Sequence, residues 1–302
     1  MHRHVLRWYR MHGRHLPWRD NNNAYHVLVS EFMLQQTQVS RVIDAFHAWC
    51  TRFPAPADLA RASRREVLLA WQGLGYNRRA MHLHETAKRL VSQHDGRIPC
   101  EIDVLQRLPG IGSYTARAIA CFGLRIRTAV VDVNVQRIFV RILGIEGKPS
   151  AGELQSIADH LLPPRAWYNW NQALMDLGAL VCTAVAPRCV SCPVRHECAT
   201  AGTHVRGRSS ETTAGVVREP PRRYFRGRII ELLRGATGHQ LTLATIGHSM
   251  KPDYSKADQP WLLDIVASLC KDGMITQRIV PPIAQRRSRN HDEPCIVIEL
   301  AE

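Results

Sequence analysis

The chain has 302 residues, 45% of them hydrophobic, and a formal net charge of +14. This length is enough for a sizeable buried core and for two or three compact units. A soluble protein with so large a basic excess is expected to meet a polyanion, and nucleic acid is the first candidate. No apolar stretch approaches the roughly 18 residues of a membrane helix. The polar start Met1-His-Arg-His has no apolar signal core, so we expect a cytoplasmic, nucleoid-associated protein without membrane contact.

Residues 1–200 are predicted to be mostly helical. Apolar side chains recur there at helical spacing, and short Gly and Pro signals separate the stretches. The predicted helical stretches are Val27–Val42, Val67–Trp71, Ala80–Leu90, Ile102–Leu108 and Thr115–Phe122. A polar segment rich in Gly, Ser, Thr and Arg runs from about residue 201 to residue 221, and it marks the best domain boundary.

Residues 222–302 have a different pattern. Helical spacing over Tyr224–Arg234 is followed by the short apolar element Leu241–Ile246 and by an amphipathic helix over Trp261–Cys270. Two strands are predicted at Met274–Val280 and Cys295–Leu300, on either side of a basic, proline-containing stretch. This order of elements is typical of a winged helix-turn-helix, and a small α+β cap without a DNA role is the alternative.

Four of the nine cysteines lie close together in the chain, with the spacing C-x6-C-x2-C-x5-C. Four thiolates in one short, loop-rich segment are typical of an iron–sulfur cluster. Zinc sites usually pair two C-x2-C elements or add regularly spaced histidines, and disulfides need an oxidising compartment. The sequence therefore predicts a [4Fe–4S] cluster, with zinc and disulfides as alternatives. The expected ligands are Cys182, Cys189, Cys192 and Cys198.

The segment Leu108-Pro-Gly-Ile-Gly112 stands between two predicted helices. Its glycines allow a tight turn and a close approach to a ligand. The helix that follows would present free N–H groups to an anion, such as a DNA phosphate. A simple packing turn is the alternative. In a basic, helical chain with a four-cysteine loop, we expect the hairpin to bind the DNA backbone without reading its sequence.

Several motifs in the same order resemble the helix-hairpin-helix DNA glycosylase superfamily and, within it, the adenine-specific (MutY-like) branch. The hairpin, the segment Val131–Arg137 and the cysteine loop carry the resemblance to the superfamily. Four further segments between residues 5 and 200 indicate the branch, namely Leu16–Arg19, Ser30–Val39, Gly73–Tyr76 and Asn171–Gly178.

The resemblance implies a mainly α fold of two lobes, with a small C-terminal α+β domain. We expect an iron–sulfur lobe made of residues 1–21 and 131–200, and a six-helix lobe with the hairpin at residues 22–130. A linker at 201–221 and the winged-helix-like domain at 222–302 follow. The resemblance also implies a monomer that binds double-stranded DNA with a mismatched or damaged pair across the cleft between the lobes.

The resemblance further implies removal of a flipped-out adenine that is mispaired with 8-oxoguanine or guanine. Breaking the N-glycosidic bond needs protonation of the base and stabilisation of an oxocarbenium-like sugar, which is work for two carboxyl groups. Glu31 matches the family's general acid, for which an apolar pocket and a raised pKa are expected. Asp132 matches the carboxylate that faces the sugar, and Asn134 the residue that holds it. Without the resemblance, a surface carboxylate and a helix N-cap would be favoured.

Tyr114 stands where bifunctional relatives have a lysine that forms a Schiff base. The resemblance therefore implies a monofunctional enzyme that leaves the abasic site uncut, with the phenol close to the sugar. Gln36 and Tyr76 match residues that wedge into the base stack. The expected DNA contacts are Leu16, Arg19, Gln35, Gln36, Thr37, Tyr76, Pro109, Gly110, Gly112 and Ser113.

Two features depart from the branch. The C-terminal segment looks like a winged helix instead of the usual domain that reads 8-oxoguanine, and Asn77 stands where a second Tyr is usual. A thymine or uracil mismatch glycosylase is therefore the alternative activity, although Gln35-Gln36 replaces the pair of arginines expected there. A non-catalytic iron–sulfur DNA-binding regulator is an alternative of another class, and the intact Glu31 and Asp132 argue against it.

Overall fold

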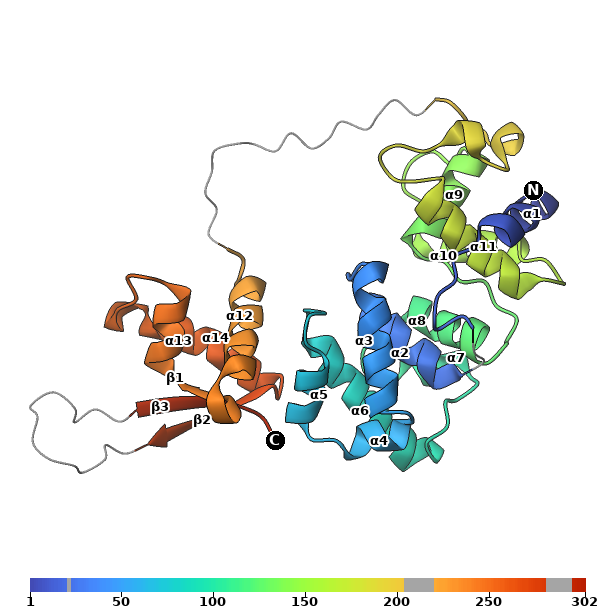
Figure 1. Ribbon diagram of the computed structural model, residues 1–302. Helices are drawn as coiled ribbons and strands as arrows, with labels where there is room; N and C mark the ends of the chain where they lie inside the picture. The colour runs from blue at the N-terminus through green and yellow to red at the C-terminus, as the bar shows by residue number, and fades with distance from the viewer. Residues whose placement is uncertain (21–22, 204–219, 281–294) are drawn as a thin grey trace, which may run out of the picture. The chain divides into compact units, whose positions relative to one another are not determined.

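The computed structural model describes residues 1–20, 23–203, 220–280 and 295–302. The chain divides into two compact units, Met1–Glu31 with Ile98–Val216 and Phe32–Arg97 with Val217–Glu302. Helices predominate, and a small antiparallel sheet lies in the second unit (Figure 1). The predicted fold class, mainly α with a small α+β part, is thus confirmed. Within the described ranges, no helix combines the length and apolar character needed to span a membrane.

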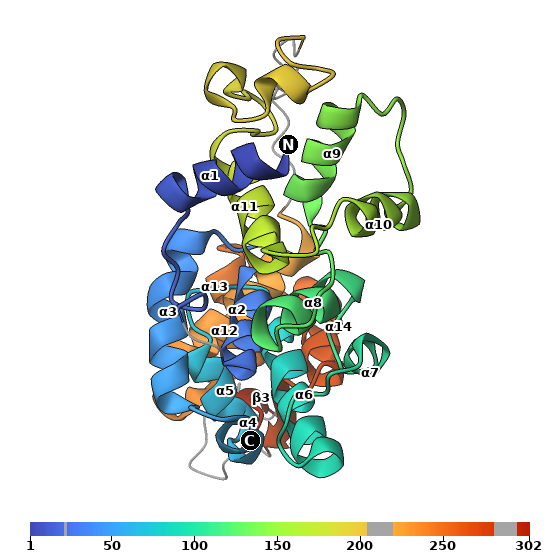
Figure 2. The same ribbon diagram turned by 90° about the vertical axis from the view of Figure 1, so that its right-hand side faces the viewer.

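The first unit is built from helices. α11 (Trp167–Leu180) packs against both α1 (His2–His12) and α9 (Val133–Leu143) (Figures 1 and 2). The other elements of this unit are α2 (Ala24–Leu34), whose last turn belongs to the second unit, α7 (Ile102–Gln106), α8 (Ser113–Ala118), the π-helical turn η1 (Ile119–Gly123), α10 (Ala151–His160) and the short 3₁₀ turns η2 (Cys189–Ser191) and η3 (Arg195–Glu197).

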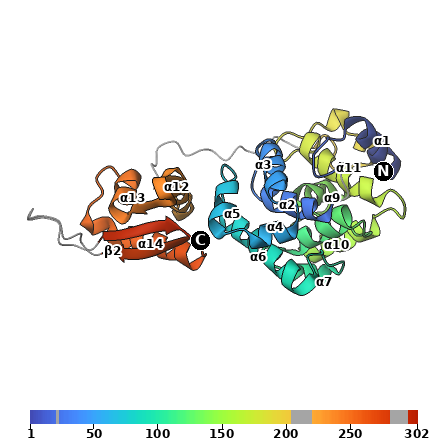
Figure 3. The same ribbon diagram turned by 60° about the horizontal axis from the view of Figure 1, so that its bottom comes forward.

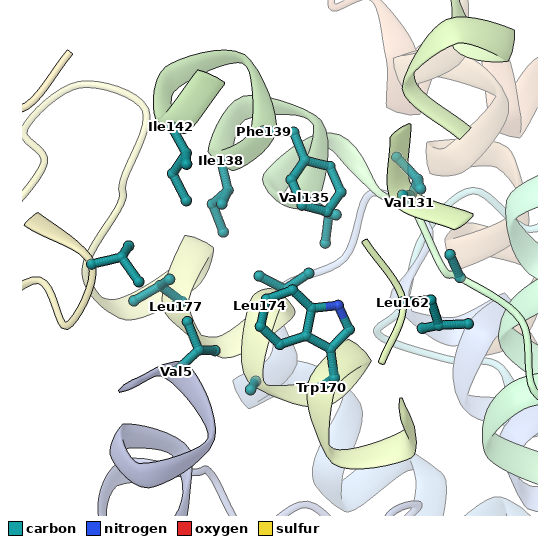
Figure 4. Packing of buried hydrophobic residues seen from close by; sticks show 14 of the residues in the cluster. Val5, Val131, Val135, Ile138, Phe139, Ile142, Leu162, Trp170, Leu174 and Leu177 are labelled. Carbon is teal, nitrogen blue, oxygen red and sulfur yellow. The ribbon is translucent and has the colours of Figure 1, made fainter. Parts of the chain in front are cut away.

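A hydrophobic core holds α1, α9 and α11 together. Trp170 and Leu174 of α11 face Val135 and Phe139 of α9, and Val5 adds the contribution of α1 (Figure 4). Burying side chains of this size is the main favourable contribution to folding. The core therefore fixes the first turn of α9, where the predicted carboxylate of Asp132 stands.

Two glycines of the first unit allow helices to approach closely. A Cβ atom at Gly178 of α11 would lie 2.6 Å from the Cβ of Asn134 in α9. A Cβ atom at Gly123 would lie 2.8 Å from the Cα of Ala24, where α2 begins. Side chains at either position would push apart the helices that carry the predicted site residues.

The N-terminal part of the second unit contains α3 (Val39–Arg52), α4 (Pro56–Arg61), α5 (Arg64–Ala70) and α6 (Arg78–His94). α6 packs against α4 and α5. Trp49 and Trp71 meet edge to face in this core, with ring centroids 5.3 Å apart.

The single helical stretch predicted over Val27–Val42 is wrong. α2 ends at Leu34 and α3 begins at Val39, with a polar loop between them. Gln36 in this loop has a φ of +57°, a left-handed conformation that a continuous helix does not allow. Apolar periodicity runs across the loop in the sequence, so spacing alone missed the break.

The C-terminal part of the second unit has the element order of a winged helix-turn-helix. Its strands pair antiparallel in the order β1-β3-β2, with Gln240 opposite Glu299 and Val280 opposite Cys295. The strands lie beside α13 and α14 (Figure 3). The elements are α12 (Arg222–Gly235), the 3₁₀ turn η4 (Thr237–His239), β1 (Gln240–Thr242), α13 (Leu243–Met250), the 3₁₀ turn η5 (Lys256–Asp258), α14 (Gln259–Lys271), β2 (Ile275–Val280) and β3 (Cys295–Leu300).

The predicted short element Leu241–Ile246 is split between a strand and a helix. Thr242 ends β1 and caps α13, since its hydroxyl accepts a hydrogen bond from the backbone N–H of Thr245 at 3.1 Å. Most of the predicted linker and the basic stretch before β3 lie outside the described residues.

Candidate active site

Glu31 is buried near the end of α2, with 7% of its surface exposed. Burial raises the pKa of its carboxyl group from 4.5 to about 7, because the charged form loses solvation. A hydrogen bond from Tyr114 lowers this pKa, the charge of Asp132 raises it, and the charge of Arg19 lowers it. A carboxyl group with this pKa is half protonated near neutral pH, so it can donate a proton there.

Tyr114 lies in the first turn of α8, directly after the glycine hairpin. Its hydroxyl group donates the hydrogen bond to Glu31. Burial, together with the charges of Glu31 and Asp132, raises the pKa of Tyr114 well above 10. The phenol therefore keeps its proton at neutral pH. The first unit thus brings together three predicted site residues from distant parts of the sequence.

Asp132 is the N-cap of α9. Its Oδ1 atom accepts hydrogen bonds from the backbone N–H groups of Asn134 at 2.9 Å and Val135 at 2.7 Å. Its Oδ2 atom accepts a hydrogen bond from the side-chain amide of Asn134 at 2.8 Å. Asp132 therefore has the geometry of a structural cap, and it also lies close enough to influence Glu31 and Tyr114.

Buried Asn171 of α11 holds the segment that leads to Asp132. Its Oδ1 atom accepts a hydrogen bond from the N–H group of Val130 at 2.9 Å, and its Nδ2 atom donates to the carbonyl oxygen of Thr128 at 3.1 Å. An extended segment buried without such partners would leave polar backbone groups unsatisfied. The sequence comparison picked out the surrounding motif but not this role.

Arg137 of α9 connects Asn134 to the cysteine loop. Its Nη2 atom donates to the Oδ1 atom of Asn134 and to the carbonyl oxygen of Gly178, both at 2.8 Å. Its Nε atom donates to the carbonyl oxygen of Cys182 at 2.8 Å. Arg137 ends the motif segment Val131–Arg137, but its bridging role was not predicted, because its contacts form only when α9 and α11 are packed together.

Arg19 binds a buried carboxylate. Asp176 of α11 is fully buried and accepts hydrogen bonds from Arg19 at 2.9 and 3.0 Å and from Arg14 at 2.7 and 2.8 Å. Burial opposes the charge of Asp176, but these arginines hold its pKa below the usual value. Leu16, in the same N-terminal segment, is buried. The DNA contacts expected from Leu16 and Arg19 stay predictions.

The glycine hairpin exposes its tip. Gly110 has a φ of +77°, and Gly110, Gly112 and Ser113 are exposed, while Pro109 is half-buried. No heavy atom lies within 4 Å of the point where a Cβ of Gly112 would stand, so the backbone there is open to a ligand. Ser113 begins α8. The DNA contact of the hairpin stays a prediction, and this open backbone leaves room for it.

Two exposed loops of the second unit carry the other predicted DNA contacts. Gln35, Gln36 and Thr37 lie between α2 and α3, and Tyr76 lies just before α6. Gln36 and Tyr76 both have a positive φ, at +57° and +45°. Half of the Tyr76 surface is exposed (48%) although the residue is a large aromatic. Such backbone conformations are held only where the surroundings impose them.

Arg79 imposes the shape of both loops. Its buried guanidinium group lies between them, and burial lowers its pKa to about 10, so it stays charged at neutral pH. The planar group has five donors in a fixed fork, which suits several carbonyl oxygens at once. It donates to the carbonyl oxygens of Phe32, Met33, Gln35, Leu74 and Gly75 and to the hydroxyl group of Thr37. No sequence motif pointed to this role.

The four clustered cysteines border one cavity. Burial raises the pKa of Cys192, and the charges of the three other thiolates add to this effect, so the four sulfurs lie near one another. The Nη1 atom of Arg141 donates to the Sγ atom of Cys182 at 3.4 Å. All four thiols are free, and no three His, Cys, Asp or Glu side chains of the described residues converge as on a single metal ion. Four cysteines around a hollow fit a group that places several atoms between the thiolates.

Comparisons with known proteins bear on the family of this chain. The model of the HhH-GPD superfamily of base excision DNA repair proteins matches residues 29–164. The chain is 40% identical over 282 residues to the adenine DNA glycosylase of Mycolicibacterium smegmatis, an alignment covering 90% of this chain and 92% of that protein. It is 42% identical over 207 residues to the human adenine DNA glycosylase, covering 64% of this chain and 38% of that protein.

Among solved structures, the chain is similar to a thermostable thymine-DNA glycosylase. The TM-score is 0.64 at 25% sequence identity, with 67% of this chain and 95% of that chain covered. The mycobacterial alignment covers 90% of the chain, so it extends beyond residue 220 into the C-terminal part. The similarity to that relative therefore includes elements outside the region that the family model matches.

Proposed function

This chain belongs to the adenine DNA glycosylases of the HhH-GPD superfamily, and from this premise we propose that it is a monofunctional enzyme of base excision repair that removes mispaired adenine. The expected partner base is 8-oxoguanine or guanine. The observation that carries the proposal is the buried Glu31 carboxyl group, whose pKa of about 7 is set beside Tyr114 and Asp132. The 40% identity to an adenine DNA glycosylase over most of both chains supports the choice of base.

Glu31 is the proton donor in this proposal. A base stacked in a duplex must first be flipped into a pocket. The protonated carboxyl group of Glu31 then gives its proton to N7 of adenine, which makes the base a better leaving group. Its pKa of about 7 keeps a large fraction in the protonated form at neutral pH, whereas an exposed glutamate would be almost fully ionised.

Asp132 stabilises the sugar. As the N-glycosidic bond breaks, positive charge develops on the sugar ring, and a fixed carboxylate nearby lowers the energy of that state. Asn134 holds the Oδ2 atom of Asp132 through its amide at 2.8 Å, and the first turn of α9 holds Oδ1. Because the protein supplies these hydrogen bonds in advance, the carboxylate needs no reorganisation when the charge develops.

Tyr114 makes the enzyme monofunctional. Strand cleavage by a glycosylase requires an amine that attacks the sugar and forms a Schiff base. A phenol cannot form one, and the hydroxyl group of Tyr114 is already directed to Glu31. Water therefore completes the reaction and the abasic strand stays intact.

The hairpin and the two loops of the second unit bind DNA in this proposal. The exposed hairpin with Gly110, Gly112 and Ser113 contacts a phosphate at the start of α8. Gln36 and Tyr76 enter the base stack and fill the space of the flipped nucleotide. Their exposure and their positive φ values, which Arg79 maintains, support this role.

A [4Fe–4S] cluster is the proposed cofactor. Cys182, Cys189, Cys192 and Cys198 border one cavity, and their free thiols form the donor set that such a cluster takes. When bound, the cluster would hold the loop of residues 182–198 in place. Arg141 and Arg137 already contact the thiol and the backbone of Cys182, so this chain's own side chains tie the loop to α9.

The second candidate function is removal of thymine or uracil opposite guanine. The similarity in fold to a thymine-DNA glycosylase favours this second function. The sequence identity to that protein is 25%, however, whereas the identity to the adenine enzyme is 40%. Both activities would use the same carboxyl groups. They differ in the base that the pocket accepts, so the substrate must be tested directly.

The test is single-turnover base release from four duplexes that contain A·8-oxoguanine, A·G, T·G or U·G. Each reaction is divided, and one half is treated with alkali to cut abasic sites. We expect release from the two adenine duplexes, with strand cuts only after alkali. Release from T·G or U·G alone would establish the second candidate function, and strand cuts without alkali would contradict the role of Tyr114.

A further inference from the structure

A cleft of about 1280 Å³ in the second unit takes no part in the chemistry above. The loops that carry Gln36 and Tyr76 form one wall, and α12 with the end of α14 forms the other. Seven arginines line the cleft, against only two carboxylates, Glu231 and Asp272. A concave surface with this charge attracts polyanions strongly.

Buried contacts fix the two walls to each other. Arg234 of α12 is buried and donates to the carbonyl oxygen of Leu68 at 2.7 and 3.1 Å and to the Oδ1 atom of Asn77 at 2.9 Å. Leu68 also belongs to the hydrophobic core of the C-terminal part. Asn77 departs from the adenine glycosylase pattern. Its Oδ1 atom accepts the hydrogen bond from Arg234 that ties the C-terminal part to the loop beside Tyr76. The cleft is a built feature of this chain.

Apart from the buried Arg79, the arginines of the cleft fall into two groups, and in the first group Arg78 pairs with Asp272 at 3.7 Å. Arg222 pairs with Asp264 at 2.7 Å, and Arg226 pairs with Asp272 at 2.5 Å, so these two hold α12 to α14. Arg41, Arg223 and Arg228 are exposed, and among the described residues they have no ion pair and no side-chain hydrogen bond. The second group is available to a ligand.

α12 carries its positive charge at an unfavourable place. Its N-terminal turns contain Arg222, Arg223, Arg226 and Arg228 and no acidic residue. The N-terminus of a helix has a partial positive charge, so cations there are destabilising and anions are stabilising. A bound phosphate would relieve this repulsion, and its oxygen atoms would accept hydrogen bonds from N–H groups of the first turn.

α14 does not offer a second DNA surface. In a helix-turn-helix, the recognition helix presents basic and polar side chains to the major groove. The exposed positions of α14 are Pro260, Asp264, Ala267 and Lys271, and Asp264 is paired with Arg222. This face carries almost no positive charge, in contrast to α12.

We propose that Arg41, Arg223 and Arg228 bind phosphates of the DNA duplex whose base stack Gln36 and Tyr76 enter. The C-terminal part then extends the DNA-binding surface through α12, and its recognition helix is used for internal packing. This inference rests on the proposed function, because it takes the loops of the opposite wall as DNA contacts. The C-terminal part then contributes to DNA affinity without reading the base sequence.

The test compares DNA affinity as a function of salt for three double variants. Arg223→Gln with Arg228→Gln removes two charges from the cleft. Arg223→Lys with Arg228→Lys keeps them. Arg61→Gln with Arg97→Gln removes two exposed arginines that do not line the cleft. Fluorescence anisotropy with an undamaged duplex gives Kd at several salt concentrations, and thermal melting checks the fold of each variant.

We expect the glutamine pair in the cleft to weaken binding about ten-fold and to lower the slope of log Kd against log salt by about 2, because roughly one counterion is released per phosphate contact. The lysine pair should bind almost as the wild type, and the control pair should change Kd less than about two-fold. Equal effects of the cleft pair and the control pair would overturn the inference, and so would unchanged affinity of the cleft pair. If the wild-type protein released no adenine from mismatched duplexes, the proposed function would be overturned instead.

Discussion

Two regions of the molecule use charge in opposite ways. In the first unit, Glu31 is buried, and the loss of solvation raises its pKa to about 7. In the second unit, Arg223 and Arg228 stand exposed at the rim of a cleft with their charges unpaired among the described residues. A proton donor must be protonated near neutral pH, which for a carboxyl group requires a raised pKa. A phosphate contact requires a side chain that keeps its positive charge, as arginine does.

This difference separates the effects of pH and salt. Ionisation of Glu31 should change the rate of base release with little effect on affinity. Salt screens exposed charges over about 10 Å at 0.1 M, so it should change affinity far more than the chemistry inside the buried pocket. The predictions below test this separation, beginning with the largest expected effect.

Glu31→Gln should abolish most base release. Glutamine has nearly the same shape but no acidic proton, and general acids contribute about 10²–10⁴ to rates. Single-turnover release on an A·G duplex measures the loss, and anisotropy measures DNA affinity in parallel. Affinity should stay within about two-fold, because the amide keeps the shape of the carboxyl group and the buried side chain contacts no phosphate in the proposed mechanism. Near wild-type turnover would show that Glu31 is not the acid.

Asp132→Asn should lower base release by about 10²–10³, because a fixed charge beside the developing oxocarbenium is lost. Asparagine caps helices as well as aspartate does, so α9 should stay folded, and the melting temperature should fall only slightly because the hydrogen bond from the amide of Asn134 is lost. Asp132→Ala is the matched control, since it loses both the charge and the cap and should cost about 1 kcal/mol of stability in addition. If Asp132→Asn retained its activity and only Asp132→Ala lost it, Asp132 would be a structural cap alone.

The motifs named residues that the structure brings together, but not the residues that hold them in place. Glu31, Tyr114 and Asp132 were recognised from motifs, and the structure brings them into electrostatic contact. Spacing along a chain reports which face of a helix is apolar, so most of the helical stretches predicted from it lie on observed helices, although several other helices had no predicted stretch. It does not report which carbonyl oxygens a buried arginine will meet, and the role of Arg79 was therefore missed.

The same limit explains the errors in the elements. The loop at Gln35–Gln38 interrupts an apolar pattern that continues on both sides, and only the left-handed backbone of Gln36 ends the helix. Strand β1 has three residues, too few for an alternating pattern to be distinguished, and it exists because β3 pairs with it. Asn77 departs from the family pattern, and the reason became visible only in the structure, where its side chain accepts a hydrogen bond from Arg234.

Arg79→Lys should destabilise the second unit by about 2 kcal/mol, because lysine has three donors and would leave buried carbonyl oxygens unsatisfied. Arg79 differs from the exposed arginines of the cleft, since it is buried and its contacts are internal. Its loss should therefore appear in urea unfolding and depend little on salt. Arg78→Lys is the control, because the side chain of Arg78 is 66% exposed and should tolerate the change. Equal stability of the two variants would show that Arg79 does not hold the loops.

The smallest expected effect is a shift in the pH dependence of base release, and this shift depends only on the ionisation of the buried Glu31 carboxyl group. In the wild type, base release should fall as pH rises through about 7, because Glu31 loses the proton that it must donate. The hydrogen bond from Tyr114 stabilises the charged form of Glu31 and so lowers its pKa. Tyr114→Phe removes that bond, and the descending limb of the pH–rate profile should move to higher pH.

At neutral pH this variant should change the rate by less than about ten-fold, since the acid and Asp132 are both kept. The salt dependence of DNA binding should be the same as in the wild type, because the buried hydroxyl group contacts no phosphate in the proposed mechanism. A limb that stayed in place would mean that Tyr114 does not act on Glu31. A shift to lower pH would mean that the phenol stabilises the protonated acid, which would reverse the sign argued from the hydrogen bond.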